Sequence, residues 1–227
     1  MDYAASNQAG SRGRMPVTIK ILIAGGFGVG KTTLVGSLTE IRPLRTEEPL
    51  SEQGVAVDRL DGVERKTTTT VALDFGRITI RENLVIYLFG TPGQERFWFM
   101  WDELARGALG AIVMADTRRL ADCFPSVDYF EQRGIPFVVG VNCFDGARRY
   151  RTEAVRSALD LDPHVPVILC DARQRPSCRD ALIALVEHAL QVFRDRPGYA
   201  SAATGAPAAG PAPAAPQRAP AASQHHR

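Results

Sequence analysis

The sequence has no hydrophobic run long enough to span a membrane, because none of its apolar stretches approaches the roughly 18 residues that a crossing requires. The first residues lack the apolar core of a signal peptide, and neither end carries a lipidation box. The net charge is only +2, too small to favour a nucleic acid or an anionic membrane as partner. We therefore expect a cytoplasmic protein with no integral membrane segment, recruited to membranes only by partners.

Cysteine is also scarce. The four cysteines of the chain are scattered and show no C-x-x-C spacing. A chain of 227 residues is long enough to bury a full core without disulfides. The pattern therefore excludes a disulfide scaffold or a zinc site and indicates a reducing compartment.

The two ends of the chain lack the apolar residues that a core needs. Residues 1–15 are polar and small, and residues 196–227 are dominated by Ala, Pro and Gly. Such segments bury too little apolar surface to fold, so both are predicted to be disordered. One domain is expected over residues 16–195.

Within that domain, short apolar runs alternate with helical patterns. Strands are predicted at 17–24, 70–80, 84–89, 111–115, 137–141 and 167–170, and helices at 33–40, 101–105, 120–133, 152–159 and 177–193. Only the second and third strands are joined as a hairpin, by residues 81–83. The fold class is therefore α/β: a mostly parallel sheet of about six strands, with one antiparallel edge hairpin, flanked by helices.

Two local features of this pattern carry separate expectations. Residues 41–66 are polar and broken by Pro and Gly, so they are predicted to form a long connection, with a short strand over 55–60 as an option. Ser177 followed by Asp180 resembles a capping box and predicts that the last helix begins there.

The most informative stretch is a G-x-x-x-x-G-K-[ST] motif between the first strand and the first helix. Its glycines allow backbone N–H groups to face inward around anionic oxygens, and Lys31 can reach the β- and γ-phosphates. The Thr32 hydroxyl can ligate Mg²⁺. The motif predicts a P-loop that binds a nucleotide through Gly25, Gly28, Val29, Gly30, Lys31, Thr32 and Thr33.

Further motifs follow in a fixed order: a threonine cluster at 67–70, then 90–97 (Gly-Thr-Pro-Gly-Gln-Glu-Arg-Phe), 142–145 (Asn-Cys-Phe-Asp) and 171–173 (Asp-Ala-Arg). With this order the sequence resembles the Ras-like small GTPases over residues 17–193. It looks closest to the bacterial branch that includes MglA and the actinobacterial conservon GTPases. The resemblance implies a molecular switch that binds GTP or GDP with Mg²⁺ and hydrolyses GTP.

The resemblance assigns roles around the γ-phosphate. Thr70, with Thr69 as the alternative, would bind Mg²⁺ in switch I, Gly93 would offer its N–H to the γ-phosphate, and Gln94 would orient the attacking water. The family's D-x-x-G aspartate is replaced here by Gly90. Asp74 is a possible substitute near the metal, and a solvent-facing strand residue is the other interpretation.

For the base, the resemblance points to Asn142 and Asp145, with Cys143 in place of the usual lysine. The Asp145 carboxylate would accept the N1–H and N2–H₂ groups of guanine, which adenine does not present. Ala172, within 171–173, would donate its backbone N–H to the guanine O6. The nucleotide set thus includes Gly93, Asn142, Asp145, Asp171, Ala172 and Arg173.

Catalysis is assigned to Gln94, Lys31 and Thr70, and metal binding to Thr32, Thr70 and Asp74. Arg65, Lys66 and Arg96 are candidates for a positive charge on the transition state, although solvated surface charges are the simpler interpretation. We expect slow hydrolysis that a partner stimulates. The apolar residues 97–101 are predicted to contribute to a partner surface or else to pack on the sheet.

Three functions stay open. The first is a GTP-hydrolysing switch, for which the resemblance implies a roadblock/LC7-type regulatory partner and a sensor-kinase-like protein. The second is an interaction module that holds GTP or GDP with little or no hydrolysis, which Gly90 and Cys143 motivate. The third is a P-loop ATPase or small-molecule kinase.

Overall fold

The computed structural model describes residues 16–49, 68–93 and 99–195. Its elements are β1 (Val17–Gly25), α1 (Lys31–Leu38), β2 (Leu44–Pro49), β3 (Thr68–Arg81), β4 (Leu84–Gly90), α3 (Trp101–Ala105), β5 (Gly110–Ala115), the 3₁₀ helix η2 (Leu120–Cys123), α4 (Phe124–Gln132), β6 (Phe137–Asn142), α5 (Thr152–Ala158), β7 (Val167–Cys170) and α6 (Arg175–Asp195). Apart from the last turn of α6, the described residues belong to one compact unit, which ends at Val192.

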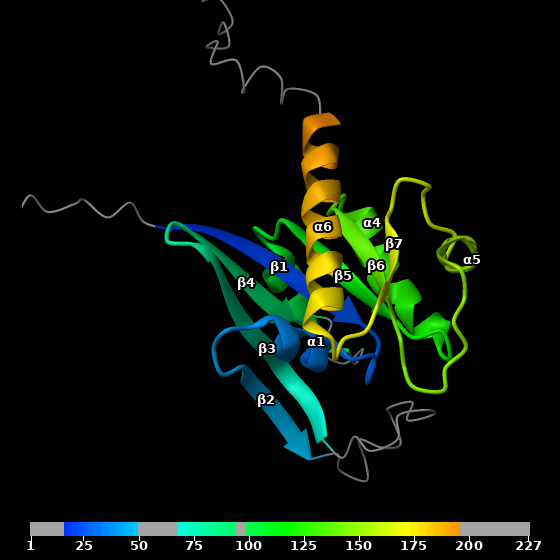
Figure 1. Ribbon diagram of the computed structural model, residues 1–227, viewed down its shortest axis with the longest axis horizontal. Coiled ribbons are helices and arrows are strands. Elements are labelled where there is room, and N and C mark those ends of the chain that lie inside the picture. The colour runs from blue at the N-terminus through cyan, green and yellow to red at the C-terminus, as the bar shows by residue number, and fades with distance from the viewer. Residues whose placement is uncertain (1–15, 50–67, 94–98, 196–227) are drawn as a thin grey trace, which may run out of the picture. The chain divides into compact units, whose positions relative to one another are not determined.

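The described strands form one seven-stranded sheet in the order β2-β3-β4-β1-β5-β6-β7 (Figure 1). β3 runs antiparallel to both of its neighbours, and every other pairing is parallel. The predicted α/β class, with a mostly parallel sheet and a β3–β4 hairpin, is confirmed. All four cysteines are free thiols.

The seventh strand is β2, and it corrects the prediction that residues 41–66 form only a long connection. β2 pairs with β3 from Leu44 opposite Phe75 to Pro49 opposite Thr68. Its polar sequence shows no strand-like alternation, because an edge strand is held by main-chain hydrogen bonds to one neighbour and tolerates charges and proline. The optional strand at 55–60 lies outside the described residues.

Two helical layers cover the sheet, and each has its own core. On one face, α3, α4 and α5 pack on the sheet around residues such as Phe130 and Val139. On the other face, α1 and α6 pack around residues such as Leu34, Ile112 and Leu185 (Figure 1). β5 and β6 are buried along their whole length, and their sequences are accordingly almost entirely apolar.

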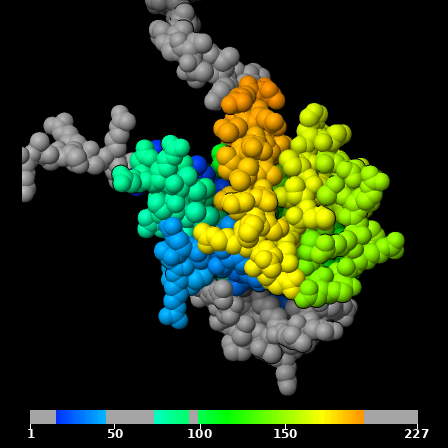
Figure 2. All heavy atoms as spheres, in the orientation of Figure 1, coloured from blue at the N-terminus to red at the C-terminus, as the bar shows by residue number. Residues whose placement is uncertain are grey.

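The first turn of α6 differs from the prediction. The helix begins at Arg175, so Ser177 lies inside it and does not cap it. The Ser177 hydroxyl instead accepts a hydrogen bond from the Asp171 N–H at 3.0 Å. In the space-filling view α6 lies at the surface between the β3–β4 hairpin and the β6–β7 region (Figure 2).

The aromatic stretch 97–101 divides between core and surface. Trp101 is buried, stacks near Phe130, and donates its indole N–H to the Pro92 carbonyl at 3.3 Å. Phe99 is 77% exposed. Residues 97 and 98 lie outside the described residues. Among the described residues of this stretch, only Phe99 is an exposed side chain that a partner could contact, so the partner surface stays a prediction. None of the described helices combines the length and apolar character needed to cross a bilayer.

Candidate functional site

The phosphate-loop motif connects the carboxyl end of β1 to the first residue of α1. Gly25 has φ +125°, and a Cβ there would lie 2.3 Å from the Met114 carbonyl oxygen. Gly30 has φ +106°, and its Cβ would lie 2.5 Å from Asn142 Nδ2. Both glycines are therefore required by conformation and by space. The expected strand–loop–helix setting is confirmed.

Lys31 lies over this loop and is 8% exposed. Its ammonium group donates to the carbonyl oxygens of Gly25 and Gly26, both at 2.8 Å. Gly93 packs against the same place, since a Cβ on Gly93 would lie 2.6 Å from Lys31 Nζ and 2.9 Å from the Phe27 nitrogen. The structure thus brings the predicted residues Lys31 and Gly93 together on the phosphate loop.

Thr32 and Asp74 are joined by a hydrogen bond. The Thr32 hydroxyl donates to Asp74 Oδ2 at 2.6 Å, and Asp74 is 1% exposed. The solvent-facing interpretation of Asp74 is therefore wrong. Asp74 pairs with Gly90 across β3 and β4, and a Cβ on Gly90 would lie 2.9 Å from Asp74 Cβ and 3.0 Å from its Oδ2. The side chain of Asp74 occupies the space that a side chain at position 90 would need.

A cleft of about 450 Å³ adjoins the loop at the carboxyl ends of β1, β6 and β7. Its lining consists of Gly28, Gly30, Thr33, Arg118, Asn142, Cys143, Phe144, Asp145, Ala172 and Arg173. Asn142 fastens this cleft to the phosphate loop, because its side-chain amide donates to the Val29 carbonyl at 2.8 Å and accepts from the Ala172 N–H at 3.1 Å. Parallel sheets bind their ligands at this edge.

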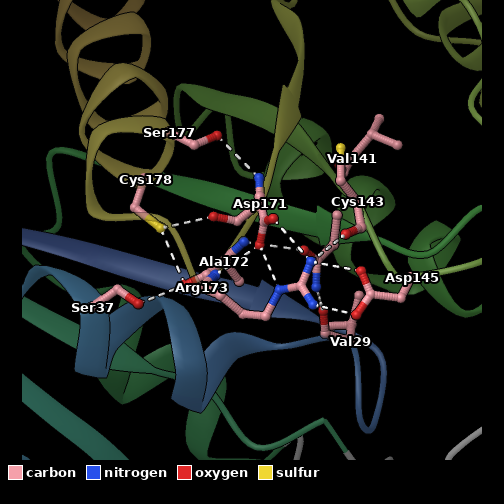
Figure 3. A network of polar contacts seen from close by, with 11 residues as sticks. Val29, Ser37, Val141, Cys143, Asp145, Asp171, Ala172, Arg173, Ser177 and Cys178 are labelled. Carbon is pink, nitrogen blue, oxygen red and sulfur yellow. Dashed lines mark hydrogen bonds and ion pairs between the residues drawn. The ribbon is translucent and has the colours of Figure 1, made fainter.

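Arg173 links Asp145, which lines the cleft, to Asp171 (Figure 3). Its guanidinium donates to both carboxylate oxygens of Asp145, at 2.6 and 3.1 Å, and to Asp171 at 2.9 and 3.0 Å. These hydrogen bonds hold the pKa of Asp145 and the pKa of Asp171 below their ordinary values. Both carboxylates are therefore anionic acceptors at neutral pH, and Arg173 is the donor that they share.

The two backbone donors of this segment already have acceptors. The Ala172 N–H, expected to meet the guanine O6, is hydrogen-bonded to Asn142. The Arg173 N–H donates to Asp171 Oδ1 at 3.0 Å. A contact from Ala172 to a base would therefore require its N–H to exchange partners.

For one predicted residue the structure describes only the strand that carries it, and several others lie outside the described residues. Thr70 belongs to β3, where it pairs with Glu47 of β2, so its backbone is in a strand in this structure. Gln94, Arg65, Lys66 and Arg96 lie outside the described residues. Their expected roles stay predictions.

The sequence-based interpretation missed Arg118, which lines the cleft. Its guanidinium lies 4.1 Å from the centroid of the Phe144 ring and donates to both oxygens of Asp116. Burial acts to raise the pKa of Asp116, but the hydrogen bonds from Arg118 outweigh it and lower that pKa. The available signal was the position of Asp116, directly after the buried strand β5 and hence at the ligand-binding edge of the sheet.

A glycine loop over a helix N-terminus, a lysine above the loop and a cleft at the carboxyl edge of a parallel sheet define the P-loop NTPase class. The chain belongs to the family described as conserved hypothetical ATP binding proteins, whose model matches residues 23–192. A curated relative, the uncharacterised protein MJ1339 of Methanocaldococcus jannaschii, is 31% identical over 129 residues, which cover 56% of this chain and 71% of that protein.

Solved structures with a similar fold include the G domain of the FeoB iron transporter of T. maritima. That domain is 19% identical, with a TM-score of 0.52, and the match covers 76% of this chain and 99% of the domain. The cytosolic domain of the same transporter in a GDP form is 17% identical, with a TM-score of 0.54, over 78% of this chain and 65% of that structure. These likenesses confirm the P-loop fold, while the MglA and conservon branch stays a prediction.

Proposed function

We propose that this protein is a GTP-binding and GTP-hydrolysing molecular switch. One observation carries the proposal. Asn142 bonds both to Val29 of the phosphate loop and to Ala172, and so connects the loop to a cleft that is lined by the Asp145 carboxylate. A nucleotide with its phosphates on the loop would have its base in this cleft, hereafter the base cleft, beside Asp145. The proposed domain for this function is residues 16–195.

On the phosphate side, the loop amides, Lys31 and the start of α1 would bind the phosphate oxygens. Lys31 is already held over the loop by two carbonyl groups, so its ammonium group is positioned before a ligand arrives. The positive end of α1 adds to the field. Thr33 lines the cleft at the point where this helix begins. Gly93 contacts Lys31 and the loop backbone at a distance that leaves no room for a side chain, which supports its proposed place beside the terminal phosphate.

The residues around Thr32 fit the Mg²⁺ that we propose as cofactor. A hydroxyl group has one donor and two acceptor sites, so a Thr32 hydroxyl that donates to Asp74 keeps its lone pairs for a cation. Oxygen donors of this kind are those that Mg²⁺ prefers, and Mg²⁺ would neutralise charge on the phosphate oxygens. Thr32 and Thr70 would hold the ion, with Asp74 orienting Thr32.

For the base, we propose guanine. The Asp145 carboxylate in the cleft is an acceptor pair, and the N1–H and N2–H₂ groups of guanine are its complement. In the structure these acceptors are taken by Arg173, so the base would exchange with the guanidinium on entry. This pair is exposed, which keeps the cost of the exchange small.

For hydrolysis, we propose that Gln94 orients the attacking water and that the segments around Thr70 and Gln94 report the third phosphate. The partners proposed from the resemblance are a roadblock/LC7-type protein and a sensor-kinase-like protein, and the exposed Phe99 could contribute to their contact surface. A cytoplasmic location, with membrane recruitment through such partners, belongs to the same proposal.

An ATPase is the second candidate. The family is described as ATP binding, and Arg173 already neutralises the acidic group on which guanine selection would depend. If Arg173 stayed in place, the cleft would present no free acceptor pair and would select less strongly for guanine.

The deciding experiment is competition against labelled GDP, together with acid release and chromatography of the nucleotide carried by purified protein. We expect GTP to displace the label as GDP does, and ATP to need an excess of at least about 100-fold. Asp145→Asn should weaken GDP binding and improve binding of xanthosine diphosphate, because an amide offers one donor to the added carbonyl. Glu103→Gln, which removes an exposed carboxylate elsewhere, is the matched control. Equal displacement by ATP would favour the ATPase.

Single-turnover hydrolysis separates the switch from a non-hydrolysing module. The wild type should hydrolyse GTP faster than Gln94→Leu, and a partner should enlarge the difference. Equal and near-zero rates for both proteins, with and without a partner, would favour the module.

A further inference from the structure

A second group of charged residues contacts the phosphate loop outside the base cleft. Arg119, between β5 and η2, is only 12% exposed and forms ion pairs with Asp122 at 3.2 Å and Asp116 at 3.8 Å. Arg119 Nη2 also donates to the carbonyl oxygen of Phe27 at 2.8 Å, across 92 residues of sequence. The nucleotide-binding roles described so far do not use this arginine.

The segment that carries Arg119 packs directly on the loop. A Cβ on Gly26 would lie 2.7 Å from Asp122 Cβ, so η2 and the loop backbone are in close contact. Gly26, Val29, Asp116, Arg119 and Asp122 line one small hollow, whereas Gly28, Gly30 and Thr33 line the base cleft. The hollow that Arg119 lines is therefore a different one from the base cleft.

The orientation of one peptide group follows from this arrangement. In a planar trans peptide the C=O of Phe27 and the N–H of Gly28 point in opposite directions. Because Arg119 holds the Phe27 oxygen, the Gly28 N–H points away from Arg119, and Gly28 lines the base cleft next to the proposed phosphate site. Gly28 has φ +73°. Because glycine adopts many backbone conformations, the Phe27–Gly28 peptide could rotate to the opposite orientation if Arg119 did not hold it.

We propose that Arg119 is a positioning residue that sets the phosphate loop for binding by holding the Phe27–Gly28 peptide in one orientation. The partners of Arg119 are consistent with this role. Asp116 is engaged mainly by Arg118, which leaves Asp122 as the near carboxylate of Arg119. The Arg119 Nε atom is buried without a hydrogen-bond partner. Replacing a buried ion pair by apolar residues is often neutral or stabilising, so stability alone does not account for the presence of the arginine.

The inference rests on the binding of a nucleoside diphosphate by the loop and does not depend on the choice of base. The test therefore compares ligands with and without phosphates. Dissociation constants of GDP and guanosine are measured for the wild type, Arg119→Ala and Arg119→Lys. If ADP proves to be the better ligand of the wild type, ADP and adenosine replace them, and only the guanine proposal fails.

We expect Arg119→Ala to weaken diphosphate binding about 10- to 100-fold, the effect of one hydrogen bond from a charged group, and to change nucleoside binding by less than about 2-fold. Arg119→Lys should restore part of the loss, since an ammonium group can still donate to the Phe27 oxygen. The Gly28 amide signal in a ¹⁵N spectrum should shift less on addition of pyrophosphate to Arg119→Ala. Arg106→Ala, which removes an exposed arginine paired with Glu103, should change neither constant.

If Arg119→Ala does not fold, Asp122→Asn provides the same comparison, because it loosens the other end of the arginine. Equal losses for diphosphate and nucleoside, or an unchanged diphosphate constant in a folded variant, would overturn the proposal. Failure of the wild type to bind either diphosphate would overturn it together with the proposed function.

Discussion

At the scale of single residues, the carboxylate beside Thr32 comes from a different strand than the resemblance to Ras-like proteins implies. Gly90 stands at the end of β4, where that resemblance calls for an aspartate, and Asp74 reaches the same space from β3. Only one of the two positions can carry a side chain, because a Cβ at position 90 would collide with Asp74. The Asp74 carboxylate on β3 therefore occupies the space next to the position on β4 where Ras-like proteins carry their aspartate.

Removing this carboxylate should weaken the Mg²⁺-dependent part of nucleotide binding. For Asp74→Ala we expect a loss of about 10- to 100-fold in Mg²⁺ affinity, the usual effect of deleting a partner that orients a metal ligand. The measurement is the dissociation rate of labelled GDP with excess Mg²⁺ and with a chelator. Asp74→Ala should release GDP faster in Mg²⁺ and equally fast in the chelator.

The control for this prediction is relocation of the charge. Gly90→Asp alone should be destabilised by overlap with Asp74, whereas Asp74→Gly combined with Gly90→Asp, which also removes the Cβ of residue 74, should recover part of the Mg²⁺ effect. If the single variant Asp74→Ala kept the wild-type difference between Mg²⁺ and chelator, Asp74 would have no part in metal binding.

At the scale of elements, α6 begins beside the base cleft and packs along its length into the core of one sheet face. Its first turn lies next to Arg173, and its buried side packs in the core with α1. Leu185 is fully buried, whereas Ile183 on the same helix is 47% exposed. The two residues provide a matched pair for the contribution of this packing.

Leu185→Ala should lower the free energy of unfolding by about 2–5 kcal/mol, because it removes buried methyl groups and leaves a cavity. Ile183→Ala should stay within about 0.5 to 1 kcal/mol of the wild type, since its side chain is half in solvent. Urea denaturation followed by circular dichroism measures both. Similar losses for the two variants would contradict the packing described for α6.

The same helix should make stability depend on pH through His188, which is 8% exposed. Burial lowers the pKa of His188 below its ordinary value of 6.5, and the neighbouring charged groups are His164 and Asp162. The unfolded chain therefore takes up this proton first as the pH falls. The stability that neutral His188 contributes to the folded protein is fully present above about pH 6.5. It is lost as the pH falls from that value toward the folded-state pKa of His188.

We expect the Tm of the wild type to fall between about pH 7.5 and pH 5.5, and the fall to be smaller in His188→Gln. His164→Gln removes a neighbouring charge that also lowers the pKa of His188, so its fall in Tm should lie between those of the wild type and His188→Gln. An identical pH dependence in His188→Gln and the wild type would assign the effect to other groups.

At the scale of the whole molecule, ligand binding should stabilise the fold, because the site joins segments from β1, β3, β6 and β7. Guanine nucleotide at about 100 times its Kd should raise the free energy of unfolding by about 2.7 kcal/mol. For a chain of this size that corresponds to a rise in Tm of about 5–10 °C. Lys31→Ala should lose this shift. Differential scanning fluorimetry with GDP, GTP and ATP measures it, and an equal shift with ATP would contradict guanine selection.

The sequence alone was sufficient for the local features. Apolar runs predicted the strands β1, β4, β5, β6 and β7. In β5 and β6 the run is almost unbroken because these parallel strands are buried on both faces. The glycine–lysine–threonine motif predicted the loop between β1 and α1, because its positive φ angles and close backbone contacts require glycine. Such features depend on neighbours in sequence, and a single chain displays them directly.

The tertiary structure decided the features that depend on distant partners. β2 exists because β3 offers it main-chain hydrogen bonds, and its own residues give no strand pattern. Asp74 reaches Thr32 because of the register between β3 and β4, and the sequence could only leave two interpretations open. The contacts of Arg173 with Asp145, and of Arg119 with the Phe27 carbonyl, span 28 and 92 residues. Charged side chains find such partners only when the sheet has brought the loops together, so periodicity and motif spacing carry no signal for them.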